Sequence, residues 1–175
     1  LKGTSLLLEC LSRLENKLPS ELSGVVQLLI FGGNSDLTEC ERFSFGVYNA
    51  GYISTPVELT KIYNASDCVV VSSLVESFGQ VAAEAQSCGV PVVAFSTSGL
   101  RDIVVDGVTG YLSMDVSSES LCDALLTLIN VNKGERYALG RAAREHIENN
   151  FSYSVVTQKY HDIIDEVKNK LDHHG

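Results

Sequence analysis

The stretch from Cys68 to Phe95, CVVVSSLVESFGQVAAEAQSCGVPVVAF, decides the fold because it holds two strand patterns separated by a helix pattern. Its first six and last five residues are valine-rich, which is typical of strands in a parallel sheet that is covered on both faces. Between them, Ser77 and Gln80 have the spacing of a capping box, and apolar residues then recur at helical intervals. The pattern predicts a helix that ends at Gly89.

The same alternation of short apolar runs and helical patterns continues on both sides of this stretch. Further strands are expected at Val25 to Phe31 and, more weakly, at Val47 to Ile53. Thr55, followed by a proline and then a glutamate three residues on, predicts a helix that runs to about Ala65. An apolar stripe from Tyr153 to Val167 predicts a long terminal helix. Together these patterns indicate an α/β fold with a parallel sheet and helices on both faces.

The beginning of the chain departs from this alternation. Lys2-Gly3 leads directly into a helical apolar pattern that runs from Leu6 to Leu14, so no strand precedes the first helix. We therefore expect that the first strand of the sheet is missing from this sequence. Residues 1–175 contain no repeat or linker that would divide them, which predicts one domain.

The composition favours a globular protein and argues against membrane-spanning, nucleic-acid-binding and metal-binding proteins. The chain has 175 residues, 45% of them hydrophobic and 20% charged, which fits one globular domain. No apolar run approaches the length of about 18 residues that spans a bilayer, so we expect a cytoplasmic protein. The net charge of −9 argues against nucleic acid or an anionic membrane as the main partner. No Asp-x-Asp element or ligand cluster implies a metal.

The five cysteines are widely spaced and include no Cys-x-x-Cys pair. They are interpreted as small buried hydrophobes in a reducing compartment. Cys40 is the exception, because it lies between two glutamates in a polar stretch and its burial is harder to predict.

Two carboxylates mark the candidate site. Glu76 falls in the loop beyond a strand, where ligands bind in open α/β sheets, and Glu84 falls on the following helix beside its buried face. A ribose diol would satisfy Glu84, and the amides of Phe78, Gly79 and Gln80 would face an anion at the helix start. Each residue alone also has a structural explanation: a cap, a surface ion pair or a solvated loop position.

Glu76 and Glu84, set in the pattern Glu-Ser-Phe-Gly…Glu-Ala-x-x-x-Gly-Val-Pro-Val-Val-Ala, resemble the hallmark of the family 4 (group 1) retaining glycosyltransferases. The resemblance extends over nearly the whole chain. It includes Lys2-Gly3, Ala50 to Ile53, Ser98 to Val104, Asp106 to Leu112 and Asn150 to Ser152.

The resemblance implies a two-domain fold of GT-B type in which this chain is the second, Rossmann-like, donor-binding domain, the C-terminal half of a larger enzyme. Glu84 would hold the ribose hydroxyls, and Glu76, the candidate catalytic residue, would contact hydroxyls of the sugar. The other implied donor-binding residues are Lys2 at the diphosphate, Ser77, Phe78, Gly79 and Gln80 at the sugar and diphosphate, and Tyr52 and Ile53 at the base. The arginine that the family pairs with the lysine would precede Leu1, and Ser72 and Ser98 replace a common proline and a common glycine.

The implied activity is retaining transfer of a hexosyl group from a UDP- or GDP-sugar to an acceptor hydroxyl, in polysaccharide or glycoconjugate synthesis. No cofactor besides the donor substrate is implied. The acceptor, and any association with a membrane, would belong to an absent N-terminal domain. Two alternatives stay open: a nucleotide-sugar epimerase of the same architecture and a non-catalytic nucleotide-binding module. The sequence has no Gly-x-Gly-x-x-Gly after a strand, which argues against a dinucleotide enzyme.

Overall fold

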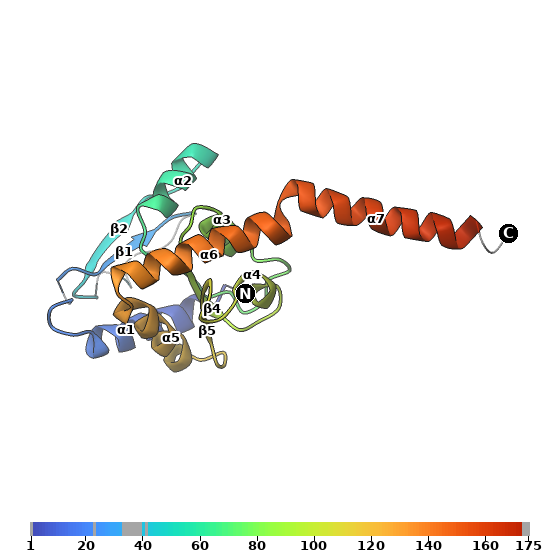
Figure 1. The fold of residues 1–175 in the computed structure, drawn as a ribbon. Coiled ribbons are helices and arrows are strands. Elements are labelled where there is room, and N and C mark those ends of the chain that lie inside the picture. The colour runs from blue at the N-terminus through green and yellow to red at the C-terminus, as the bar shows by residue number, and fades with distance from the viewer. Residues whose placement is uncertain (1, 23, 33–39, 41, 173–175) are drawn as a thin grey trace.

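The computed structural model describes residues 2–22, 24–32, 40 and 42–172, and Figure 1 shows their arrangement. The strands are β1 (Gln27–Ile30), β2 (Gly46–Asn49), β3 (Val69–Val71), β4 (Val92–Phe95) and β5 (Gly110–Ser113). The helices are α1 (Thr4–Lys17), α2 (Pro56–Asn64), α3 (Gln80–Ser87), α4 (Leu100–Ile103), α5 (Ser118–Asn130), α6 (Lys133–Phe151) and α7 (Tyr153–Asp172).

All strand pairs in the described residues are parallel, and they form two sheets. One sheet pairs β1 with β2, with Leu28 opposite Val47. The other has the order β3-β4-β5, with Val70 opposite Val93 and Val93 opposite Tyr111. The expected α/β fold with parallel strands and intervening helices is confirmed, and each predicted strand is present in a shorter form.

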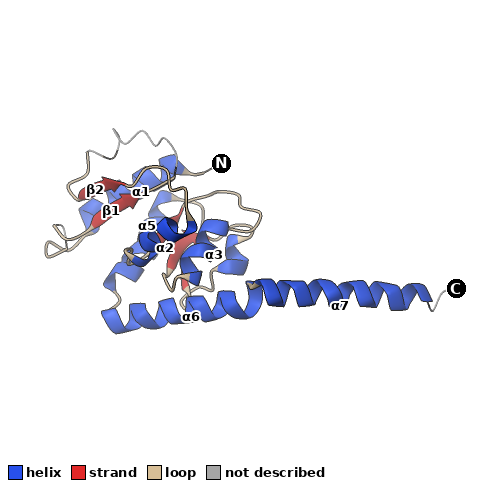
Figure 2. Cartoon of the chain, turned by 90° about the horizontal axis from the view of Figure 1, so that it is seen from above, coloured by secondary structure: helices blue, strands red, loops and turns tan. Residues whose placement is uncertain are grey.

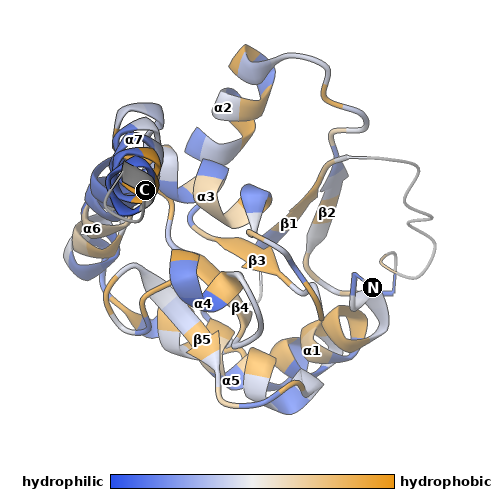
Figure 3. Cartoon of the chain, turned by 90° about the vertical axis from the view of Figure 1, so that its right-hand side faces the viewer, coloured by the Kyte–Doolittle hydropathy of each residue, from blue (hydrophilic) through white to orange (hydrophobic). Residues whose placement is uncertain are grey.

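Helices cover the strands on both sides. Figure 3 shows α1 and α5 on one side and α2, α3 and α6 on the other. β4 alternates between them, because Val93 and Phe95 join the core under α1 and α5 while Val92 and Ala94 join the core under α3 and α6. All four side chains are fully buried, as expected for a strand of a parallel sheet covered on both faces.

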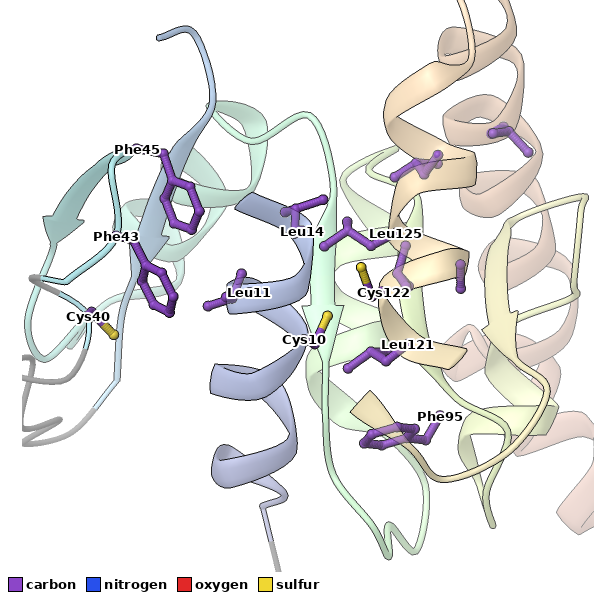
Figure 4. Close-up of a cluster of buried hydrophobic side chains, with 14 residues drawn as sticks. Cys10, Leu11, Leu14, Cys40, Phe43, Phe45, Phe95, Leu121, Cys122 and Leu125 are labelled. Carbon is purple, nitrogen blue, oxygen red and sulfur yellow. The ribbon is translucent and has the colours of Figure 1, made fainter. Parts of the chain in front are cut away.

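The core under α1 and α5 contains three of the cysteines, and Figure 4 shows it in close-up. Cys10 and Cys122 are fully buried where the two helices face each other. Cys40 is buried as well, despite its polar neighbours in the sequence. Burial raises the pKa of the Cys10 thiol to about 12, so this side chain is a neutral hydrophobe at physiological pH.

The last helix, α7, follows the C-terminal end of α6 and projects away from the rest of the domain (Figures 1 and 2). The predicted long terminal helix is therefore confirmed. Its apolar side chains, among them Tyr160, Ile163 and Val167, are exposed instead of packed against the sheet. In the described part of the chain, no helix has the length and apolarity needed to cross a membrane.

Candidate functional site

Most of the candidate residues lie in the loops that follow the carboxyl ends of β2 and β3. The loops after β1 and β2 meet where the Gly32 N–H donates to the Gly51 carbonyl at 2.9 Å. The loops after β3 and β4 meet where the Gly99 N–H donates to the Glu76 carbonyl at 3.0 Å. In open α/β sheets this edge is where ligands bind, so these loops lie where a ligand site is expected.

Lys2 and Glu76 are brought into contact although 74 positions separate them. Lys2 Nζ lies 3.3 Å from Glu76 Oε1, and the Ser72 hydroxyl donates to the Lys2 carbonyl at 2.9 Å. Gly3 makes this approach possible, because its φ is 62° and a Cβ there would lie 2.0 Å from the Ser72 carbonyl oxygen. Only glycine fits such a position without strain.

Glu76 is held in its charged form. A hydrogen bond from Ser73 lowers the pKa of the Glu76 carboxyl below its usual range, and the ammonium of Lys2 lowers it further. The Lys2 side chain is 78% exposed, so its attraction to Glu76 is screened by water. The pair is therefore weak, and an incoming anion can replace Glu76 as the partner of Lys2.

The start of α3 differs from the sequence prediction. The predicted capping box from Ser77 to Gln80 is wrong, because the helix begins at Gln80 and its N-cap is Gly79 with φ 92° and no side-chain cap. Ser77 is held elsewhere, since its carbonyl lies against Gly99, where an added Cβ would be 2.7 Å away. The amides without intrahelical partners therefore lie from Gly79 to Ala82, not from Phe78 to Gln80.

Glu84 is bound on both carboxylate oxygens. The Tyr63 hydroxyl donates to Oε2 at 3.0 Å, and the Gln80 side-chain amide donates to Oε1 at 2.9 Å. Tyr63 is only 2% exposed, and burial raises its pKa, with the Glu84 carboxylate raising it further. Tyr63 is therefore a neutral donor that fixes the carboxylate. Each oxygen keeps a lone pair for another donor.

The remaining predicted site residues differ in exposure. Phe78 packs edge-on against Phe151, with 5.6 Å between the ring centroids, and Ser77 is open to solvent. Tyr52 is 81% exposed, and Ile53 is partly buried beside it in the loop that leads to α2. The contacts among the described residues join Lys2 to Glu76 and Gln80 to Glu84, but they do not join Tyr52 or Ile53 to either pair.

Sequence reasoning missed Tyr63 and Ser73. Tyr63 lies on the buried face of α2, and a tyrosine in a core position is a signal by itself, because a buried hydroxyl needs a partner. Ser73 is buried directly after β3, and nothing in its sequence context distinguishes it from Ser72. Arg101 donates to the Ser96 carbonyl at 2.8 Å and so supports the loop after β4.

Two further observations concern the backbone of these loops and their capacity to bind a metal ion. Ser98 has a φ of 40°, in the left-handed region, which L-residues with a side chain rarely adopt and which is common in functional loops. Within the residues that the structure describes, no three His, Cys, Asp or Glu side chains lie close enough together to hold a metal ion.

Comparison with solved structures supports the fold. Anabaena Alr3699/HepE, solved in complex with UDP-glucose, aligns with a TM-score of 0.72 at 24% identity, over 94% of this chain and 45% of that one. A variant of S. aureus TarM, solved with fondaparinux, α-GlcNAc-glycerol and UDP, aligns with a TM-score of 0.74 at 27% identity, over 92% of this chain and 32% of that one.

Comparison of sequences identifies the family. The D-inositol 3-phosphate glycosyltransferase of Xylanimonas cellulosilytica is 38% identical over 153 residues, which is 82% of this chain and 34% of that protein. The chain thus spans about a third of the length of this relative. The family model of the glycosyl transferases group 1 matches residues 1–146. The chain therefore belongs to the glycosyl transferases group 1 family.

Proposed function

We propose that this chain binds a UDP-sugar and is the donor-binding part of a retaining glycosyltransferase that transfers a hexosyl group to an acceptor hydroxyl. The observation that carries the proposal is the contact of Lys2 with Glu76, at 3.3 Å, beside the loops that follow β3 and β4. It places a cation and a carboxylate at the edge where α/β sheets bind ligands. Family membership supports the reaction class, and the UDP bound to TarM supports uracil as the base.

Glu84 is proposed to bind the ribose. Its two oxygens are held by Tyr63 and Gln80, so the carboxylate has a fixed orientation before a ligand arrives. A charged carboxylate has about four lone-pair positions, of which these two contacts use two. The other two suit the adjacent hydroxyls of a ribose diol.

Lys2 and the first amides of α3 are proposed to bind the diphosphate. Lys2 would exchange Glu76 for a phosphate oxygen, and the amides from Gly79 to Ala82 would donate to the same anion, which is favoured at a helix N-terminus. These groups would also stabilise the charge that develops on the diphosphate as the bond to the sugar breaks.

Glu76 is proposed to contact hydroxyls of the donor sugar. Once Lys2 takes the diphosphate, the Glu76 carboxylate keeps its hydrogen bond from Ser73 and is free to accept from the sugar. Ser77 and Phe78 follow it in the same loop and would line the sugar site. The exposed ring of Tyr52, with Ile53 beside it, would lie against the base.

The acceptor site is proposed to lie in the rest of a longer protein, because the chain spans only about a third of its curated relative. This chain alone is then expected to bind UDP without catalysing transfer. Sugar transfer by the purified 175-residue chain would contradict the proposal that the acceptor site lies in another part of a longer protein.

Isothermal titration with UDP, GDP and NAD tests the proposal. We expect binding of UDP, weaker binding of GDP and none of NAD, and we expect the UDP affinity to be unchanged by EDTA. Binding of NAD in preference to UDP, or absence of UDP binding by the folded chain, would overturn the proposed donor. Loss of UDP affinity in EDTA would instead require a metal in the site.

A further inference from the structure

The loop that joins β3 to α3 has no regular structure, yet its backbone is held closely by the loop that follows β4. The Gly99 N–H donates to the Glu76 carbonyl at 3.0 Å. A Cβ added to Gly99 would lie 2.7 Å from the Ser77 carbonyl oxygen and 2.8 Å from the Cα of Phe78. These distances are too short for a side chain, so glycine at this position lets the two loops lie against each other.

The need for glycine at position 99 comes from the available space alone. Gly99 has a φ of −61° and a ψ of −16°, which residues with a side chain also adopt. Its neighbour Ser98 is different, because a φ of 40° places it in the left-handed region at a cost of about 1 to 2 kcal/mol. Such strain persists where the surrounding contacts fix the backbone, and the contacts of Gly99 do so here.

The end of α6 gives the same loop a second support. Phe151 is the last residue of α6, and its ring packs edge-on against Phe78 with 5.6 Å between the centroids. The His146 ring also lies 5.6 Å from the Phe151 ring. His146 is fixed in turn, because Nε2 lies 3.1 Å from the Asp102 carbonyl oxygen and Nδ1 lies 3.2 Å from the Asn150 side-chain amide. Phe151 therefore joins an anchored side chain to the ring of Phe78, which is 45% exposed.

We propose that Gly99 and Phe151 are positioning residues for the donor sugar. Gly99 fixes the backbone that carries Glu76, and Phe151 fixes the ring of Phe78, so the loop has its binding shape before the ligand arrives. Neither Gly99 nor Phe151 is proposed to touch the sugar. A preformed loop loses less conformational freedom on binding, which strengthens its contacts with the sugar hydroxyls. The inference rests on the proposed function, because it concerns the sugar part of the same site.

Isothermal titration of a Gly99→Ala variant tests the first support. UDP, UDP-glucose and UDP-N-acetylglucosamine are titrated, and the UDP-sugar that binds the unmodified chain more tightly is kept. We expect the ratio of the UDP-sugar Kd to the UDP Kd to rise about tenfold, as for one lost hydrogen bond. The Kd of UDP itself should change little, because the contacts proposed for Lys2 and Glu84 lie outside the altered loop.

Gly24→Ala is the matched control for this variant. Gly24 lies outside the left-handed region and has no neighbour within 4 Å, so a Cβ there meets nothing. Its Kd ratio should equal that of the unmodified chain. An unchanged ratio in a folded Gly99→Ala variant would overturn the role of Gly99.

Phe151→Leu tests the second support, and it decides the inference if Gly99→Ala does not fold. Loss of the aromatic contact should raise the Kd ratio about threefold, and the same change in a Phe78→Leu background should have little further effect. Phe45→Leu is the control, since it breaks the stacked pair with Phe43 and should lower stability without changing the ratio. An unchanged ratio in Phe151→Leu, or additive effects of Phe78→Leu and Phe151→Leu, would overturn the role of Phe151.

The unmodified chain separates a failure of this inference from a failure of the proposed function. If that chain binds neither UDP nor a UDP-sugar, the proposed function is overturned and the inference is overturned with it. If it binds UDP but neither UDP-sugar, the sugar site and the inference are overturned while the nucleotide site stands. If it binds both ligands and the ratio is the same in Gly99→Ala and Phe151→Leu, only the two positioning roles are overturned.

Discussion

Glu76 and Glu84 lie on the same segment between β3 and the end of α3, yet their surroundings are opposite. Glu76 is in a loop, and its cationic partner is the exposed side chain of Lys2, which comes from the far end of the sequence. Glu84 is on a helix, and its partner is the buried hydroxyl of Tyr63, with Gln80 on the other oxygen. One carboxylate has a partner that a ligand can replace, and the other is held in place by the core.

This difference gives the two carboxylates of the candidate site different expected responses to a ligand. A loop carboxylate with an exposed ion pair changes partners at little cost, because water already screens the pair. A carboxylate fixed by a buried donor keeps one geometry, so less conformational freedom is lost when a ligand binds. The comparison predicts that changes near Glu76 alter local structure or the response to the sugar, whereas changes near Glu84 alter affinity for the nucleotide itself.

The largest effect is expected for Gly3→Ala, which pushes Lys2 away from Glu76. The substitution adds left-handed strain of about 1 to 2 kcal/mol and overpacking of about 1 to 3 kcal/mol, because the new Cβ would lie 2.0 Å from the Ser72 carbonyl. Gly51→Ala is the control, since Gly51 has φ 68° but no neighbour within 4 Å. Chemical denaturation should show a clearly larger loss for Gly3→Ala, and equal losses would mean that the approach to Ser72 is not tight.

The second effect is a loss of nucleotide affinity in Glu84→Gln. Removal of the charge should weaken UDP binding by about 1 to 3 kcal/mol, the range for a charge-assisted hydrogen bond. Glu76→Gln should not weaken the binding of bare UDP and should reduce affinity only for the full UDP-sugar. Titration calorimetry with both ligands separates the two, and Glu148→Gln on the exposed face of α6 is the control. If both mutants bind bare UDP equally, the two carboxylates do not have separate roles.

A smaller effect is expected for Tyr63→Phe, which keeps the ring and its edge-on contact with Phe31 but removes the hydroxyl. Loss of one hydrogen bond should reduce UDP affinity by about 0.5 to 1.5 kcal/mol. In the Glu84→Gln background the same change should have little further effect, which a double-mutant cycle measures. Full additivity would show that Tyr63 does not act through Glu84.

The smallest effect concerns the ionisation of Glu76. Its pKa in the folded chain is below the ordinary value of 4.5, so its contribution to stability is present above that pH and is lost as the pH falls through the folded pKa. Ser73→Ala should raise the Glu76 pKa more than Lys2→Met does, because the Ser73 hydrogen bond is the larger cause and Lys2 is exposed. NMR titration of the Glu76 carboxyl measures both, and the reverse order would contradict this assignment.

The sequence predicted some local features correctly because they depend on adjacent residues. The α2 cap is one example: Thr55 accepts from the Glu58 N–H at 3.2 Å, and Pro56 opens the helix, as the pattern indicated. The start of α3 is the counterexample, since the same kind of pattern at Ser77 failed. There the Glu76 carbonyl accepts from Gly99, on the loop after β4, and this contact holds the chain out of the helix until Gly79.

The sequence by itself determined the parallel α/β fold, the four strands and the helices predicted between them, and the two carboxylates of the candidate site, because period, caps and motif spacing are local properties of the chain. Only the tertiary structure decided that Lys2 meets Glu76 and that Tyr63 holds Glu84. These features join residues from different elements, and the position of one element against another follows from packing over the whole domain, which no short stretch of sequence encodes.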